Sequence, residues 1–258
     1  MELLAALPLT DLSWIHQPDA WIALLTLTVL EIVLGIDNIV FISILVAKLP
    51  EAEQPRARFL GLALAMVMRI ILLFSISWVM TLNENLFTLL GHGFSGKDLI
   101  LVGGGLFLLF KSTKEIHHKL EGEHDAVVGG GVAKVALGAI LIQIAMLDLV
   151  FSLDSVITAV GMADSILVMV IAVVIAVGFM MIFAGAVSDF INRHPTIKML
   201  AMSFLILIGV MLTIEGISPE KARELHLKNY IYFAMAFSIL VEMLNIRSSR
   251  KRREAAAH

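Results

Sequence analysis

The chain has 258 residues, of which 59% are hydrophobic and 16% are charged, and its mean hydropathy is +0.93. Soluble domains are usually about 45–50% apolar and about 25% charged, so this composition excludes an ordinary soluble protein. The net charge of -3 says little about partners, but no basic, aromatic-rich segment indicates nucleic acid. The lack of cysteine excludes disulfides and thiolate metal sites.

Apolar runs of roughly 20 residues recur along the chain, and each can cross a hydrocarbon core of about 30 Å as a helix. We therefore expect an all-α, polytopic membrane helix bundle that forms a single transmembrane domain over residues 1–258. The first span is expected to be kept, because the N-terminal segment lacks the basic region of a signal peptide. Seven spans are expected, at residues 20–47, 57–82, 97–114, 133–160, 164–189, 197–215 and 229–247.

Three connections between these spans carry distinct signals. Residues 83–96 are expected to form a short loop with Gly and Asn. Residues 115–132 are polar, charged and the longest connection, and we interpret their His and acidic residues as a solvated loop rather than a metal-recruiting segment. Residues 216–228 predict a turn and a short helix, with Ser218 at the N-cap and Pro219 at the first helical position.

The charges predict the orientation of the chain. Seven spans place the two ends on opposite sides of the membrane. If the C-terminus faces the cytoplasm, most of the 19 Lys and Arg residues lie in cytoplasmic segments, including the basic tail at 247–258. The positive-inside rule therefore predicts an outside N-terminus and an inside C-terminus. The tail is interpreted as a topology anchor in preference to a lipid-binding patch.

One motif occurs twice in the chain. Glu31–Ile39 (EIVLGIDNI) recurs as Asp148–Val156 (DLVFSLDSV), which matches the first span to the fourth. We predict two three-span repeats, at about residues 20–114 and 133–215, followed by an extra span at 229–247. Because three is odd, the second repeat enters the membrane from the opposite side. Inverted repeats are typical of secondary transporters, whose binding site lies near the membrane midplane.

The two motif copies place four carboxylates inside apolar spans. On insertion scales a charged residue at a helix centre costs about 2.5–3.5 kcal/mol, so such a set requires a compensating role. An amide or hydroxyl side chain follows the second acid of each copy, and an oxygen-only set suits Mn²⁺, Mg²⁺ or Ca²⁺ better than Cu⁺ or Zn²⁺. The predicted metal ligands are Glu31, Asp37, Asn38, Asp148, Asp154 and Ser155.

The spacing of the acids predicts irregular helices. Acids six residues apart lie about 120° apart around a regular helix and face different neighbours. Gly35 and Ser152 lie between the acids at the same motif position. We therefore expect both helices to be interrupted there, so that both carboxylates and some freed carbonyls turn toward one point.

Three other polar residues within spans are secondary candidates. Arg69 is expected to form a structural ion pair with one of the acids, and the acids as a set have the alternative interpretation of protonated or paired packing features. Gln143 is expected to hydrogen-bond to a neighbouring helix. Glu242 either lines the transport pathway or, in the preferred interpretation, pairs with the basic tail.

The chain resembles a known family. EIVLGIDNIVF (31–41) and DLVFSLDSVITAV (148–160) resemble the two signature motifs of the TerC family of integral membrane proteins, and residues 193–209 and 230–245 resemble its C-terminal stretches. The family is similar to LysE-type exporters and is associated with tellurium resistance, and its bacterial members are implicated in manganese efflux. The resemblance implies a multi-pass protein of the bacterial inner membrane whose acidic motif positions fall on the four carboxylates.

We therefore expect a secondary transporter that exports a divalent cation, first of all Mn²⁺, with protons as the exchanged ion. No P-loop or nucleophile elbow is present in the sequence, so neither an enzymatic activity nor a cofactor other than the transported ion is expected. The expected partners are the cation, the lipid bilayer and, as an open question, a second copy of the chain. Two alternatives stay open: a membrane assembly or scaffold factor, and a proton-coupled carrier or channel for another solute.

Overall fold

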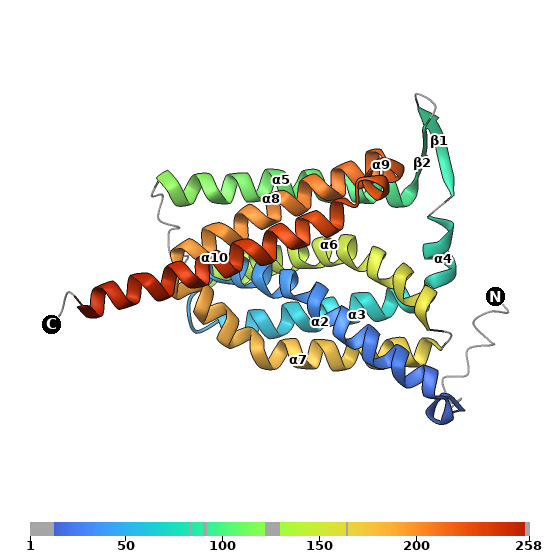
Figure 1. The fold of residues 1–258 in the computed structure, drawn as a ribbon, viewed down its shortest axis with the longest axis horizontal. Helices are drawn as coiled ribbons and strands as arrows, with labels where there is room; N and C mark the ends of the chain where they lie inside the picture. Colours follow the sequence, from blue (N-terminus) through green and yellow to red (C-terminus); the bar gives the residue numbers. More distant parts are fainter. Residues whose placement is uncertain (1–12, 83, 90–91, 122–129, 164, 256–258) are drawn as a thin grey trace. The chain divides into compact units, whose positions relative to one another are not determined.

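A computed structural model describes residues 13–82, 84–89, 92–121, 130–163 and 165–255 (Figure 1). Helices dominate this part of the chain, and prolines in the first turn begin several of them. In chain order the elements are η1 Ser13–His16, α2 Pro18–Val46, α3 Gln54–Phe74, α4 Ile76–Thr81, β1 Asn85–Leu89, β2 His92–Ser95, α5 Gly96–Glu121, α6 Gly130–Met162, α7 Ile166–Arg193, α8 Pro195–Ile217, α9 Pro219–Glu224 and α10 Leu227–Ala255.

Among the described residues, six helices are long and apolar enough to cross a membrane, which fits a polytopic helical membrane protein. They are Pro18–Val46, Gln54–Phe74, Leu137–Met162, Ile166–Arg193, Pro195–Ile217 and Leu227–Ser248. The helix at the third expected span, α5, has 26 residues but carries charged residues near both ends of its apolar stretch, and it is not one of the six. The count of seven spans, the repeats and the orientation therefore stay predictions.

The connections are more ordered than the sequence suggested. The expected loop at 83–96 contains the two-stranded sheet of β1 and β2, where Phe87 stacks on Phe94 with ring centroids 5.4 Å apart. The prediction that a loop begins at residue 115 is wrong, because α5 continues to Glu121. Within this last part of the helix, His117 Nε2 lies 3.2 Å from the Glu121 carboxylate. Hydropathy detects only the apolar part of a helix. Lys, Glu and Leu have high helix propensity, so the helix continues past the apolar stretch without a hydropathy signal.

The short helix expected within residues 216–228 is confirmed. It is α9, with Ser218 at the N-cap position and Pro219 in the first turn. The Ser218 side chain makes no capping hydrogen bond. The fixed φ angle of Pro219, rather than the serine hydroxyl, therefore favours a helix start at this point.

The contacts divide the chain into two compact units. Unit 1 holds α2, α3, α4, α6 and nearly all of α7, and unit 2 holds α5 from Asp98, together with α8, α9 and α10. In unit 1, α6 packs against α2, α3 and α4 around fully buried side chains such as Leu62, Leu147 and Leu153. This packing carries the polar cluster described below.

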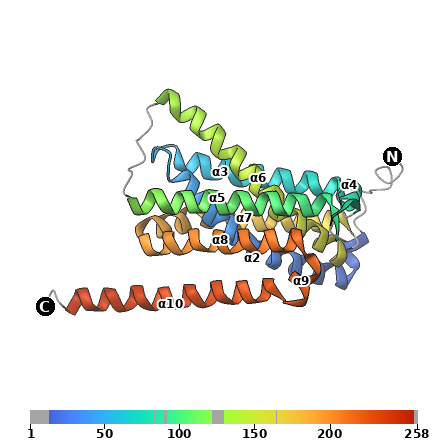
Figure 2. The same cartoon turned by 90° about the horizontal axis from the view of Figure 1, so that it is seen from above.

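Unit 2 is built around α8, which packs against α9 and α10. Figure 2 shows α5 running beside α8, and the two helices cross at glycines. A Cβ on Gly105 would lie 2.7 Å from the Gly209 carbonyl oxygen, and a Cβ on Gly209 would lie 2.9 Å from the Gly105 carbonyl oxygen. Only residues without a side chain permit this approach of two backbones.

Candidate functional site

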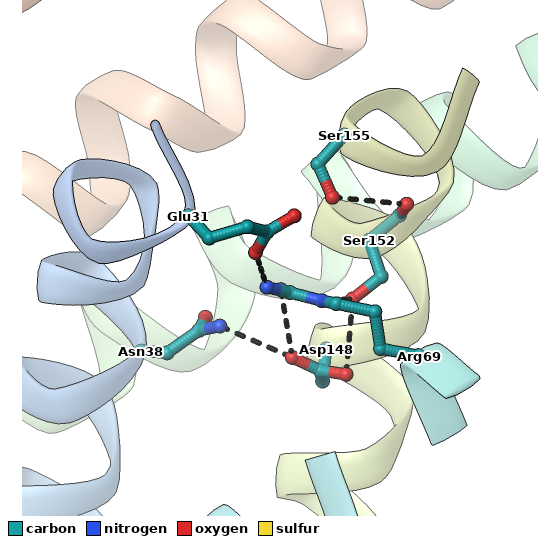
Figure 3. Close-up of polar contacts among 6 residues, drawn as sticks. All are labelled: Glu31, Asn38, Arg69, Asp148, Ser152 and Ser155. Carbon is teal, nitrogen blue, oxygen red and sulfur yellow. Dashed lines mark hydrogen bonds and ion pairs between the residues drawn. The ribbon is translucent and has the colours of Figure 1, made fainter. Parts of the chain in front are cut away.

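Helices α2, α3 and α6 bring six polar side chains together inside unit 1 (Figure 3). Their exposed fractions run from 0% for Ser152 to 8% for Asn38, so water does not compensate their charges and dipoles. Buried polar groups of this kind are stable only when they are paired with one another. The six residues are Glu31 and Asn38 from α2, Arg69 from α3, and Asp148, Ser152 and Ser155 from α6.

Arg69 lies at the centre of the cluster, and each of its guanidinium nitrogens has a partner. Nη1 forms an ion pair with Glu31 Oε2, and Nη2 lies 3.5 Å from Asp148 Oδ1. Nε donates to Ser152 Oγ at 3.0 Å. The planar fork of an arginine suits this arrangement, because it presents its donors to several acceptors at once. The guanidinium therefore connects an acid of the first motif copy to an acid of the second.

Asp148 is held by neighbours on both carboxylate oxygens. Its Oδ1 accepts a hydrogen bond from Asn38 Nδ2 at 3.1 Å, and its Oδ2 accepts one from Ser152 Oγ at 3.0 Å. The Ser155 hydroxyl donates to the Ser152 carbonyl oxygen at 3.2 Å, within the same helix. The bond from Asn38 to Asp148 joins the two motif copies directly across the interface of α2 and α6.

The predicted interruption of the two motif helices is wrong. Both α2 and α6 are helical through Gly35 and Ser152. A Cβ on Gly35 would lie 2.3 Å from the Sδ atom of Met180, so this glycine leaves room for a side chain of α7. Ser152 instead uses its hydroxyl to bind Asp148 and Arg69. The small residues serve close packing and hydrogen bonding, which a sequence pattern does not distinguish from a helix break.

The second acid of each motif copy is placed only along its helix. Asp37 lies in α2 and Asp154 in α6, but their side chains are outside the described part of the structure. Among the side chains that are described, no group of three or more His, Cys, Asp or Glu residues is arranged to hold a metal ion. The metal site of the two motif copies therefore stays a prediction, because it depends on the side chains of Asp37 and Asp154, which are not described.

Two secondary candidates bind within their own helices. The amide of Gln143 donates to the Ala139 carbonyl oxygen at 3.1 Å, so the expected bond to a neighbouring helix is wrong. Glu242 lies in α10 and accepts a hydrogen bond from Asn245 at 3.4 Å, one turn later. The side chains of residues 249–258, with which Glu242 was expected to pair, lie outside the described part of the chain.

A small cavity adjoins Glu31, and no sequence pattern predicts it. Among the described residues that line it, Glu31 is the only charged one, and the space holds about one water molecule. The others are the apolar residues Leu27, Leu73, Val156, Ala159, Met169, Ala172 and Val173. Three of them belong to α7, which is apolar from Ile166 to Val187, so no polar residue in that stretch marks a cavity wall. This water-sized space therefore borders one residue of the polar cluster, Glu31.

The comparisons with known proteins agree with this arrangement of apolar helices. The profile of the Integral membrane protein TerC family matches residues 16–256. The chain belongs to the TerC family. It is 55% identical over 242 residues to the UPF0053 inner membrane protein YgdQ of Escherichia coli (strain K12), covering 93% of this chain and 98% of YgdQ. No solved structure matches the chain.

Two further relatives match most of this chain, and the second of them is about twice as long. A UPF0053 protein of Haemophilus influenzae is 52% identical over 247 residues, which cover 92% of this TerC family chain and 98% of the relative. The UPF0053 inner membrane protein YoaE of Escherichia coli (strain K12) is 48% identical over 236 residues, which cover 91% of this chain and 44% of YoaE. Together with the six apolar helices, these relatives place the TerC family protein in the bacterial inner membrane as a multi-pass protein.

Proposed function

We propose that this TerC family protein is a secondary transporter that exports a divalent metal cation, with Mn²⁺ as the first candidate. The observation that carries the proposal is the hydrogen bond between Asn38 and Asp148, which joins the two motif copies inside the bundle. Glu31 lies in the same cluster. Acids buried in apolar helices are costly and mark ion pathways in membrane proteins.

The chemistry of the donor set supports a hard cation. Carboxylate, amide and hydroxyl oxygens suit Mn²⁺, Mg²⁺ and Ca²⁺, and no thiolate is available in a chain without cysteine. In the proposal Asp37, Asp154 and Ser155 complete the ligands supplied by the cluster. Because α2 and α6 are continuous, Asp37 and Asp154 lie about 120° around their helices from Glu31 and Asp148, so the proposal requires these helices to turn or open locally when the cation binds. Protons on the carboxylates compensate the charge after the cation leaves, which makes proton exchange the proposed driving reaction.

The proposed architecture consists of two inverted three-helix repeats and an extra helix, with the N-terminus outside and the C-terminus inside. Unit 1 contains the first two helices of both proposed repeats, α2 with α3 and α6 with α7. Unit 2 contains the third helix of each, α5 and α8, which meet at reciprocal glycines. In this scheme α5 is the remaining span, and alternating access rocks one three-helix repeat against the other around the site.

A flux assay tests the function. Mn²⁺ transport is measured in vesicles that contain the wild-type protein, Asp37→Asn or Asp154→Asn. Loss of transport is expected in both variants, because each removes one charged ligand of the proposed site. Asp19→Asn is the matched control, since Asp19 lies exposed in the first turn of α2 and outside the cluster. Unchanged transport in both motif variants would contradict the proposal.

The ion pairs of Arg69 favour a second candidate, a membrane assembly or scaffold factor. Because Arg69 already pairs with Glu31 and Asp148, the cluster is stable without a metal. In that case Asp148→Asn abolishes co-purification of a partner protein and leaves the metal content of cells unchanged. A proton-coupled carrier for another solute is the third alternative, and stabilisation of the purified protein by Mn²⁺ against heating argues against it.

A further inference from the structure

Glu31 has a cation on one side and an empty space on the other. Its Oε2 pairs with Arg69 Nη1, and Glu31 is also one of the residues that line the small cavity between α2, α3, α6 and α7. Figure 3 shows the second carboxylate oxygen turned away from the guanidinium. The other described lining residues are apolar, so a cation that enters this cavity meets Glu31 as its charged ligand.

We propose that Arg69 is a tethered cation that occupies the carboxylate site when no substrate cation is bound and competes with that cation for Glu31. This inference rests on the proposed transport function. Within the described cluster one guanidinium charge faces two carboxylates. A divalent cation bound at Glu31 in place of the guanidinium would lie close to that guanidinium, and two positive groups in a buried site repel each other strongly.

The contacts indicate which bond of Arg69 is exchanged. Among the described partners of Arg69, Glu31 is the one that lines the cavity. The contacts with Asp148 and Ser152 come from α6 and lie within the packed helix interface. When the cation binds, Glu31 therefore exchanges Arg69 for the cation, and the guanidinium keeps its partners on α6. When the cation leaves, Arg69 neutralises Glu31 again, so that both described carboxylates of the cluster, Glu31 and Asp148, have the guanidinium as a partner.

This role makes a prediction opposite to that of a merely structural arginine. Removing a competing cation raises the affinity for the substrate, because a site blocked in part of the molecules binds more weakly in proportion to the blocked fraction. Removing a structural support lowers the affinity. Transport also separates the two roles. If Arg69 is a tethered cation, its removal is expected to lower KM, because nothing competes for Glu31. It is also expected to lower the turnover, because the empty site can no longer be neutralised.

The experiment is a calorimetric titration of Mn²⁺ into the purified full-length protein at constant pH. Arg69→Gln is expected to lower the Kd by a coupling factor of about 5–150-fold. Arg58→Gln is the matched control, because Arg58 lies on the same helix and contacts Ser188 at 3.3 Å instead of a carboxylate. The control is expected to leave the Kd unchanged.

Two milder variants keep the test decisive if Arg69→Gln does not fold. Ser152→Ala removes the acceptor of Nε, and Arg69→Lys keeps the charge without the fork. Both are expected to lower the Kd less than Arg69→Gln does. If a folded variant has a Kd for Mn²⁺ equal to or higher than that of the wild type, the competing role of Arg69 is refuted, whereas the proposed transport function is not. A wild-type protein that binds no divalent cation overturns the proposed function as well.

Discussion

Replacing Gly35 by Ala tests whether the small residue of the first motif exists for packing against α7. The new Cβ would lie 2.3 Å from Met180 Sδ and 2.8 Å from Met180 Cε, so the buried methionine must move. Overpacking costs about 1–3 kcal/mol, and the better helix propensity of Ala returns about 1 kcal/mol. Because Sδ and Cε are the flexible end of the methionine, part of this cost is relieved. We expect Gly35→Ala to be neutral or to lower the free energy of unfolding by up to about 1 kcal/mol, measured by denaturation in detergent micelles.

The control and the rescue lie in the same unit. Gly178 is also helical, but a Cβ there meets nothing within 4 Å, so Gly178→Ala is expected to raise stability by about 0.5–1 kcal/mol. In a Met180→Ala background, Gly35→Ala is expected to become stabilising, since the clashing side chain is absent. If Gly35→Ala stabilises the wild-type protein as Gly178→Ala does, the packing explanation is refuted and a flexible helix at Gly35 regains support.

Two further predictions concern a carboxylate and a helix crossing. Asp148→Asn leaves the buried guanidinium with one carboxylate and is expected to destabilise by about 3 kcal/mol, while exposed Asp19→Asn changes stability by less than about 0.5 kcal/mol. Equal unfolding midpoints would contradict the ion pair. Gly105→Ala places a Cβ 2.7 Å from a backbone oxygen of α8 and is expected to cost about 1–3 kcal/mol. Gly103→Ala, which meets open space, is expected to be neutral or stabilising, and a similar loss for both variants would contradict the close crossing.

The helical membrane class and several helix starts could be predicted because their signals are local. An apolar run predicts a span from composition alone, and a proline such as Pro219 restricts where a helix begins. The repeated motif also located both Asn38 and Asp148, which the structure brings into one hydrogen bond. Self-similarity provides information about distant parts of a chain that no single window contains.

The role of the small motif residues could not be predicted, because it depends on neighbours far away in the sequence. Gly35 faces Met180, and Ser152 lies between Asp148 and Arg69. A glycine or serine between two acids is compatible with a helix break, a close contact or a hydrogen bond. The three-dimensional contact decides among them, and in both motif copies it favours a continuous helix.

The cavity beside Glu31 was equally inaccessible to sequence reasoning. Its walls come from four helices, and its α7 residues such as Met169 and Val173 are indistinguishable by type from ordinary lipid-facing residues. Figure 3 also shows that the arginine expected to neutralise one acid contacts two, Glu31 and Asp148. The pattern of charges predicts that a partner is required, whereas only the packing determines how many acids that partner reaches.

The most direct test of the central claim is a calorimetric comparison of Mn²⁺, Mg²⁺, Ca²⁺ and Zn²⁺ binding to the purified protein. The wild type is expected to bind Mn²⁺, and both Glu31→Gln and Asp154→Asn are expected to lose that binding, because each removes a carboxylate from one motif copy. Asp19→Asn is expected to bind as the wild type does. Undiminished Mn²⁺ binding in both motif variants, or no binding to the wild type, would contradict a cation site shared by the two copies.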